Sequence, residues 1–248
     1  MMKEEVLSGR RGYPIPALST LNGTEKRSVL VIHGFASSRY SDTGVRLAER
    51  LAAQNIGVYA IDLPAHGAST RDELHIDECL DSMADAAQRM RLVAPQTEIF
   101  LFGSSFGGYL AILYLALRDP SIRRAMLRCA AVNMPELMDG DLTPALRAEI
   151  ERQGYYIFDP GYSRTIRITR AFFDELHAHD AFALADRFRT SLQMIHGTND
   201  EEVPLPAVQR FAAQTGAALR LVEGAGHRFA EPGATETVLD VAERFFTA

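Results

Sequence analysis

The sequence lacks the features that mark membrane proteins and disulfide-stabilised secreted proteins. No apolar run is long enough to span a bilayer, and the opening residues Met1–Leu7 carry acidic side chains where a secretory signal would be basic. The two cysteines, Cys79 and Cys129, fall in a predicted helix and a predicted buried strand, so we expect free core thiols. Neither lies in a glycine-flanked turn, which leaves a cysteine nucleophile without support. These features predict a cytoplasmic protein without disulfides.

Positive charge is also in short supply. Acidic residues outnumber Lys and Arg by 32 to 26, so the net charge is −6 at pH 7. Binding to nucleic acid or to an anionic membrane surface therefore has no electrostatic support, whereas small neutral or apolar substrates fit this balance. The sequence shows no repeat, low-complexity tract or linker, and its length suits one sizeable core. We predict a single domain over residues 1–248.

Apolar strand candidates alternate with helical patterns along the chain. The candidate strands are Val29–Ile32, Ile56–Ile61, Ile99–Phe102, Ala125–Ala131, Leu192–Ile195 and Leu219–Val222. This alternation predicts an α/β fold with a mostly parallel central sheet and helices on both faces. Apolar side chains recur at helical spacing over residues 76–90, which is typical of core packing rather than of a cofactor site. The proline-containing opening segment through Leu21 predicts one or two antiparallel edge strands.

One long stretch interrupts this rhythm. From about residue 133 to residue 189, helical and mixed segments stand between two predicted core strands, as expected of a small inserted cap. Within it, Gly154–Tyr162 and Thr165–Ile168 predict a short hairpin around the turn Asp159-Pro160-Gly161. Its aromatic side chains either line a pocket or pack the cap onto the domain, and the sequence favours neither.

A predicted strand, a tight turn and a predicted helix meet at Gly103-Ser104-Ser105-Phe106-Gly107. Ser105 lies at the apex of the turn, and the glycines two residues before and after it relieve the crowding of so sharp a bend. The helix behind offers free N–H groups and a positive dipole end beside the serine. A plain turn with Ser105 as a helix cap would show the same pattern, so a nucleophile also requires a base, an acid and an oxyanion hole.

His227 is the predicted base, because a serine hydroxyl is a poor nucleophile until an imidazole takes its proton. It lies in the glycine-rich loop Glu223–His227, between a predicted strand and the C-terminal helix. Another pair of histidines, His177 and His179, resembles a metal site only superficially, since residues two apart on a helix point to different faces. We predict no metal and no organic cofactor.

Asp200 is the predicted acid. It follows the candidate strand Leu192–Ile195, at the sheet end where open parallel sheets place catalytic groups. Glu201 and Glu202 are rivals, but the order Ser105, Asp200, His227 matches the order expected when a nucleophile elbow comes first.

Two backbone N–H groups are predicted to form the oxyanion hole. Phe106, which follows the nucleophile, supplies one, and Phe35, in the loop after an earlier buried strand, supplies the other. The small Gly34 lets that loop approach a substrate, and His33 is interpreted as a structural residue that holds it.

Three further motifs resemble those of the alpha/beta-hydrolase superfamily over nearly the whole chain. His33-Gly34-Phe35 resembles its HG oxyanion loop, Asp62–Ser69 resembles its D-x-x-G-H-G-x-S segment, and His196–Pro204 resembles its acid loop. Size and motifs are similar to small monoacylglycerol-lipase-like and feruloyl-esterase-like esterases, with serine-aminopeptidase-like proteins close by. Two positions depart from the pattern: Ser104 stands where the family often has a larger side chain, and Ala65 where it usually has glycine.

The residues and the resemblance together imply an alpha/beta-hydrolase fold and a serine hydrolase that cleaves carboxylic esters through an acyl-enzyme on Ser105. The expected partner is a small-molecule ester. Amidase or aminopeptidase activity and thioesterase or acyltransferase activity would use the same side chains. A non-enzymatic, hydrolase-like binding protein is the alternative from another class, because a fold does not dictate a function.

Overall fold

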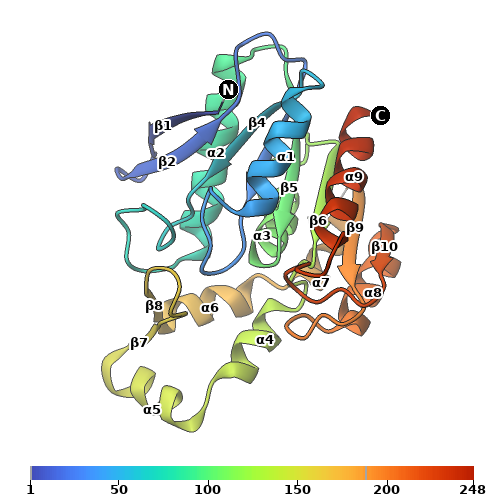
Figure 1. Ribbon diagram of the computed structural model, residues 1–248. Coiled ribbons are helices and arrows are strands. Elements are labelled where there is room, and N and C mark those ends of the chain that lie inside the picture. The colour runs from blue at the N-terminus through green and yellow to red at the C-terminus, as the bar shows by residue number, and fades with distance from the viewer. Residues whose placement is uncertain (1, 188) are drawn as a thin grey trace.

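An eight-stranded sheet forms the centre of the computed structural model, which describes residues 2–187 and 189–248 (Figure 1). The strands follow the spatial order β1-β2-β4-β3-β5-β6-β9-β10. Their bounds are β1 Lys3–Ser8, β2 Pro14–Ser19, β3 Arg27–Ile32, β4 Gly57–Ile61, β5 Glu98–Ser104, β6 Arg124–Arg128, β9 Ser191–Gly197 and β10 Ala218–Val222. The six strands from β4 to β10 are parallel, and β1 and β2 form an antiparallel edge. The predicted mostly parallel sheet and its edge strands are confirmed.

Helices cover both faces of this sheet. On one face lie α1 (Asp42–Ala52) and α9 (Ala234–Thr247), and on the other lie α2 (Ile76–Val93), α3 (Phe106–Leu117) and α8 (Leu205–Thr215). Because side chains alternate along a strand, each central strand contributes side chains to the apolar cores on both faces of the sheet. In β3, Leu30 and Ile32 pack on the α2 and α3 side, whereas Val29 and Val31 pack on the α1 and α9 side.

The segment between β6 and β9 forms a separate group of small elements at one end of the sheet, in the lower part of Figure 1. These elements are α4 Met134–Asp141, α5 Pro144–Gln153, β7 Tyr155–Phe158, β8 Ile166–Thr169, α6 Arg170–Ala178, α7 Ala181–Leu184 and the 3-10 turn η1 Ala185–Arg187. The predicted hairpin is confirmed, since β7 and β8 pair antiparallel. At its turn the Gly161 N–H donates to the Asp159 carboxylate at 2.9 Å, and Gly161 has a φ of 74°. That the predicted segment 133–189 acts as a cap over a single domain stays a prediction.

One predicted boundary is wrong. The strand expected over Ala125–Ala131 ends at Arg128, because Cys129 has a φ of 44° and so leaves the extended conformation. Cys129 therefore lies just beyond β6 rather than within a strand. Both Cys79, in α2, and Cys129 are buried free thiols. In the described ranges no helix combines the length and the apolar character that crossing a membrane requires.

Candidate active site

Ser105 lies at the sharp bend between β5 and α3, with a φ of 52° and a ψ of −118°. Such a positive φ is disfavoured for a residue that carries a Cβ. Backbone hydrogen bonds hold it there: the Ser105 N–H donates to the Arg128 carbonyl at 2.9 Å, and the Ser105 carbonyl accepts from the N–H groups of Gly108, Tyr109 and Ala131 at 2.9, 3.1 and 3.1 Å. The hydroxyl takes no part in these bonds, so the geometry of the bend does not depend on it.

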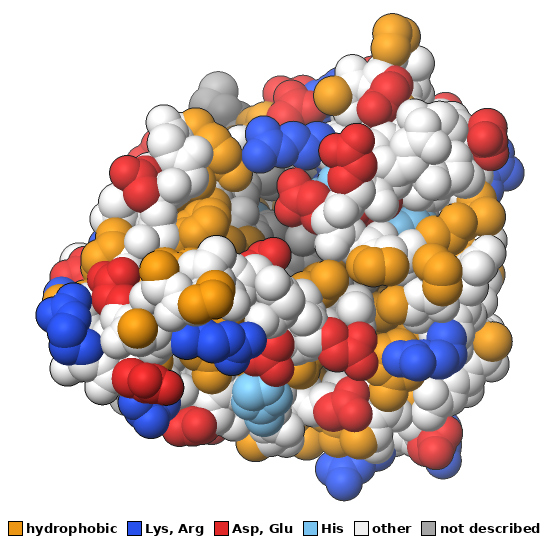
Figure 2. Space-filling model, turned by 90° about the horizontal axis from the view of Figure 1, so that it is seen from below, with side chains coloured by type: hydrophobic (Ala, Val, Ile, Leu, Met, Phe, Trp, Pro, Cys, Tyr) orange, Lys and Arg blue, Asp and Glu red, His pale blue; other side chains and the backbone are white. Residues whose placement is uncertain are grey.

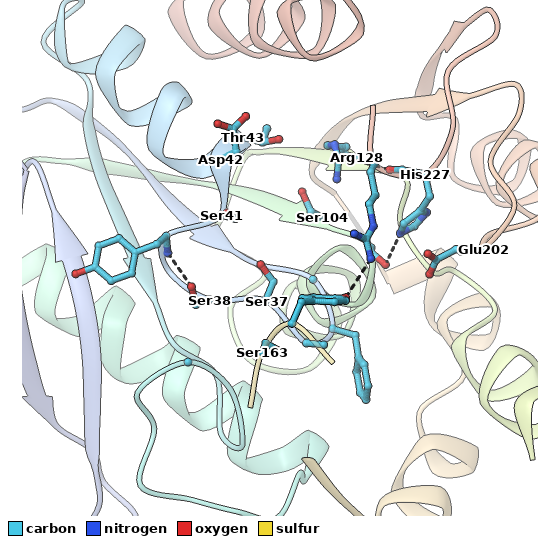
Figure 3. A pocket seen from close by; sticks show the side chains of 18 of the residues that line it. Ser37, Ser38, Ser41, Asp42, Thr43, Ser104, Arg128, Ser163, Glu202 and His227 are labelled. Atoms are coloured by element: carbon cyan, nitrogen blue, oxygen red, sulfur yellow. Dashed lines mark hydrogen bonds between the residues drawn. The ribbon is translucent and has the colours of Figure 1, made fainter. Parts of the chain in front are cut away.

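The three predicted triad residues meet at the carboxyl end of the sheet, and Figure 3 shows His227 among the side chains around the cavity there. His227, in the loop between β10 and α9, lies with its Nδ1 2.9 Å from both carboxylate oxygens of Asp200. Its Nε2 lies 3.0 Å from the Ser105 Oγ. Since Nδ1–H donates to the carboxylate, Nε2 is left as the acceptor for the hydroxyl. The neighbouring acids Glu201 and Glu202 are exposed and make no such contact with the imidazole.

Asp200 is held ionised by its surroundings. Its side chain is fully buried, and burial opposes ionisation. Hydrogen bonds from His227, from the Cys129 thiol and from the Val203 N–H outweigh this cost and lower the pKa of Asp200 to about 2. The carboxylate can thus orient the imidazole and stabilise its protonated form throughout the neutral range.

This lowered pKa makes stability depend on pH in a predictable direction. The pKa of Asp200 lies below the usual value of about 3.9, so the ionised side chain should contribute about 2 kcal/mol to the free energy of unfolding. That contribution is fully present above about pH 4 and is lost as the pH falls towards 2. The difference in the free energy of unfolding between wild type and Asp200→Asn, measured by urea unfolding, should therefore decrease from pH 5 to pH 2. For Glu202→Gln, a change at an exposed acid nearby, the difference from wild type should not decrease in this way. A difference for Asp200→Asn that stays constant over this range would contradict the assignment.

The two predicted oxyanion donors belong to segments that adjoin Ser105. Phe106 is the first residue of α3, so its N–H has no partner within the helix. Phe35 follows Gly34 in the loop after β3, and a Cβ added to Gly34 would lie 3.3 Å from the Ser105 Cβ. The loop thus runs directly alongside the serine.

Buried polar groups hold the loop after β3 in place through hydrogen bonds. The Leu63 N–H donates to Nε2 of His33 at 3.1 Å, so the proton is on Nδ1, which donates to the Gly34 carbonyl at 2.8 Å. Burial lowers the pKa of His33 to about 4, which keeps the ring neutral. The Asp62 carboxylate accepts from the Ala68 N–H at 2.8 Å and forms an ion pair with Arg39. His33 therefore has the structural role that the sequence indicates.

A cavity of about 670 Å³ opens around Ser105 and His227. Side chains from the loop after β3, from the start of α1 and from the β7–β8 turn line it. Its lining includes the hydroxyls of Ser37, Ser38, Ser41, Thr43, Ser104 and Ser163. Phe158 and Tyr162 of the hairpin also line it, whereas Tyr156 is buried in the core, so the aromatic side chains of the hairpin divide between lining and packing. Seen from the end where the inserted segment lies, the surface is hollowed and carries both acidic and basic side chains at the rim (Figure 2).

One group of side chains in the described ranges has metal-ligand character: donor atoms of Cys129, His196 and Asp200 lie within 4.8 Å of one another. Metal binding would require the thiolate, and burial raises the pKa of Cys129. Asp200 already accepts from His227 and the thiol. These contacts favour a hydrogen-bonded support for Asp200. Of the other histidines weighed for a metal, His177 contacts Asp139, and His179 donates to the Glu175 carbonyl.

Comparison with known proteins agrees with this architecture. The sequence profile described as serine aminopeptidase, S33, matches residues 23–231. The chain belongs to this family of alpha/beta hydrolases. The predicted superfamily and fold are thereby confirmed, and the protein is a hydrolase of this fold.

Solved structures resemble this hydrolase over almost its full length. A putative hydrolase from Agrobacterium vitis S4 shares 19% identity, with 99% of each chain covered and a TM-score of 0.83. Est1E from Butyrivibrio proteoclasticus, solved with ferulic acid bound, shares 19% identity, with 97% of each chain covered and a TM-score of 0.81. The Pyrococcus furiosus esterase Pf2001 shares 16% identity over 99% of this chain and 93% of that one, with a TM-score of 0.71. At these identities the likeness concerns the fold.

Two residues of the site are missing from the sequence prediction. Cys129 supports Asp200, and the side chain of Arg128 lines the cavity. A charged residue near the end of an otherwise apolar strand was a usable signal for Arg128, because polar side chains at the carboxyl ends of parallel strands often face a ligand site. Nothing in the sequence distinguishes Cys129 from an ordinary core thiol.

Proposed function

We propose that this hydrolase is a serine esterase that cleaves carboxylic esters of small substrates through an acyl-enzyme on Ser105. The observation that carries the proposal is the continuous hydrogen-bonded chain from the Ser105 hydroxyl through His227 to the ionised Asp200. A serine so connected, with N–H groups of Phe35 and Phe106 beside it, has the parts that acyl transfer needs.

In the proposed mechanism, Nε2 of His227 removes the hydroxyl proton as the Ser105 Oγ attacks the ester carbonyl. The negative charge that develops on the carbonyl oxygen is stabilised by the N–H groups of Phe35 and Phe106. The imidazolium then gives its proton to the departing alcohol. A water molecule, activated by the same imidazole, attacks the acyl-enzyme and releases the acid, which regenerates the free serine.

The resemblance to Est1E and Pf2001 favours esters, since the first is solved with ferulic acid bound and the second is an esterase. The family description favours a second candidate, hydrolysis of aminoacyl amides. Both reactions would use the same three side chains. They differ in the leaving group, which must be protonated for an amine and need not be for an activated alcohol.

A fluorophosphonate probe and two substrate series test this proposal. The probe should label wild type on the peptide that contains Ser105, as read by mass spectrometry, and pretreatment with it should block turnover. Short p-nitrophenyl esters should be cleaved with a kcat/KM at least about a hundredfold above that for matched aminoacyl p-nitroanilides. A higher kcat/KM for the anilides would favour the aminopeptidase function over the esterase function. Failure of the probe to label the folded protein would contradict both functions.

A further inference from the structure

Arg128 is a buried cation without an ionic partner among the residues that the structure describes. It is 8% exposed and lines the cavity around Ser105. Its Nη2 donates to the His227 carbonyl at 3.1 Å, and its guanidinium lies 5.0 Å from the centroid of the Phe229 ring. Its Nε is buried and finds no hydrogen-bond partner in those ranges. The contacts of this guanidinium are thus with uncharged groups.

Such an arrangement is energetically costly. Removing a guanidinium from water costs several kcal/mol unless an anion and good hydrogen bonds compensate. Burial accordingly lowers the pKa of Arg128, although a guanidinium stays charged at neutral pH. The two acids that line the same cavity, Asp42 and Glu202, are exposed, and Asp42 lies 3.7 Å from Arg46. Solvent screens those acids. The ionised Asp200 favours the charged guanidinium electrostatically, but it forms no ion pair with Arg128 and is already engaged by His227.

Hydroxyl groups that line the same cavity as Arg128 are suited to an anion. Ser104 is the register partner of Arg128 across β5 and β6, and the residues two positions before them, Phe102 and Met126, pack on the α1 and α9 face. The hydroxyls of Ser104, Ser37 and Ser41 line the cavity and donate to no described residue. Ser41 precedes the first turn of α1, whose N–H groups add a positive end. Figure 3 shows Arg128 and Ser104 on the side of the cavity where Ser41 and the start of α1 lie.

We propose that Arg128 binds an anionic group of the substrate, so that the preferred substrates are esters that also carry an ionised carboxylate. The guanidinium would form a charge-assisted hydrogen bond with the carboxylate, and the neighbouring hydroxyls would donate to its remaining lone pairs. This inference rests on the proposed esterase function, because it places the anion site beside the nucleophile.

Matched ester pairs test the preference directly. Monomethyl glutarate against methyl valerate places the charge on the acyl side, and para-acetoxybenzoate against para-acetoxybenzamide places it on the alcohol side. We expect kcat/KM for the charged member of one pair to exceed that of the neutral member by about tenfold or more. The pair that shows the preference identifies the side of the ester that faces Arg128. Equal rates within both pairs would overturn the proposal.

Substitution of Arg128 separates binding from a merely structural role. Arg128→Gln should lower the charged-to-neutral ratio of kcat/KM by about tenfold, and Arg128→Lys should restore part of it. If Arg128 only held the His227 carbonyl, both members of a pair would lose activity equally and the ratio would stay unchanged, which would refute the proposal. The matched control is Arg124→Gln, which removes the same charge from the opposite end of β6, where the guanidinium donates to the Phe245 carbonyl. The charged-to-neutral ratio of kcat/KM for Arg124→Gln should stay within about twofold of the wild-type ratio.

Binding without turnover keeps the failure of this inference distinct from failure of the esterase proposal. Calorimetry with monomethyl glutarate should detect binding to Ser105→Ala and an affinity at least about tenfold weaker in Ser105→Ala/Arg128→Gln. If wild type cleaves no ester but this difference is found, the anion site stands and the esterase proposal fails. If wild type cleaves neutral esters and Ser105→Ala shows no such binding, the anion site fails alone.

Discussion

Replacing Ser105 with alanine should lower kcat for ester hydrolysis by about 10⁴-fold or more while the protein stays folded. The variant loses the oxygen that lies 3.0 Å from Nε2 of His227, and no other hydroxyl takes that place in the hydrogen-bonded chain. The bend itself should survive, because backbone groups of Ser105 make the bonds that hold its positive φ. Alanine carries the same Cβ, so the conformational strain hardly changes.

The measurement combines steady-state hydrolysis of a p-nitrophenyl ester with far-UV circular dichroism and thermal unfolding. We expect an unchanged spectrum and a Tm within about 3 °C of wild type. Ser163→Ala is the matched control, since its hydroxyl lines the same cavity from the β7–β8 turn and has no contact with His227. It should keep at least about a third of wild-type activity. Near-normal hydrolysis by folded Ser105→Ala would show that another group is the nucleophile.

The sequence was sufficient to predict that Ser105, Asp200 and His227 lie together, because local patterns and one topological rule act together. Glycines around Ser105 and in the loop before His227 indicate tight turns, and apolar runs indicate the strands that precede them. In a parallel sheet the carboxyl ends of all strands lie at one edge. Loops more than a hundred residues apart in sequence are therefore brought together, as Ser105 and His227 are.

Cys129 was beyond this reasoning for a physical reason. The run from Ala125 to Ala131 is apolar enough to predict a continuous strand, and only the structure shows that Cys129 turns the chain with a φ of 44°. Non-glycine residues give no sign of such a turn in the sequence. The turn ends β6, and the Cys129 thiol then supports Asp200, which follows the neighbouring strand β9.

The inserted segment shows the same limit. Its hairpin was predictable because Asp159-Pro160-Gly161 specifies a turn through local geometry alone. Which aromatic side chain reaches the cavity was not, because that depends on how the segment packs on the sheet. At Ala65, in contrast, the family's usual glycine indicates the backbone conformation. The structure gives Ala65 a φ of 63°, the conformation that glycine adopts most readily.

Gly107→Ala should destabilise the protein by about 3 kcal/mol, although Gly107 lies in a helix, where alanine is normally the better residue by about 1 kcal/mol. A Cβ at this position would lie 2.3 Å from the Ile32 carbonyl oxygen and 2.4 Å from that of His33. Both atoms belong to the backbone at the end of β3 and cannot rotate away. Relief requires α3 to move from the loop that carries Phe35, so ester hydrolysis should also fall by at least about tenfold.

Gly140→Ala is the control that isolates this contact. Gly140 lies exposed near the end of α4, and nothing lies within 4 Å of a Cβ added there, so only helix propensity should act. Urea unfolding should give a free energy of unfolding that is unchanged or raised by up to about 1 kcal/mol. The two variants make the same chemical change in two helices, so opposite signs would assign the loss in Gly107→Ala to the close approach of α3 to β3. A higher free energy of unfolding in both variants would show that the loop after β3 can move to accommodate a methyl group. The predicted oxyanion hole would then not depend on that close approach.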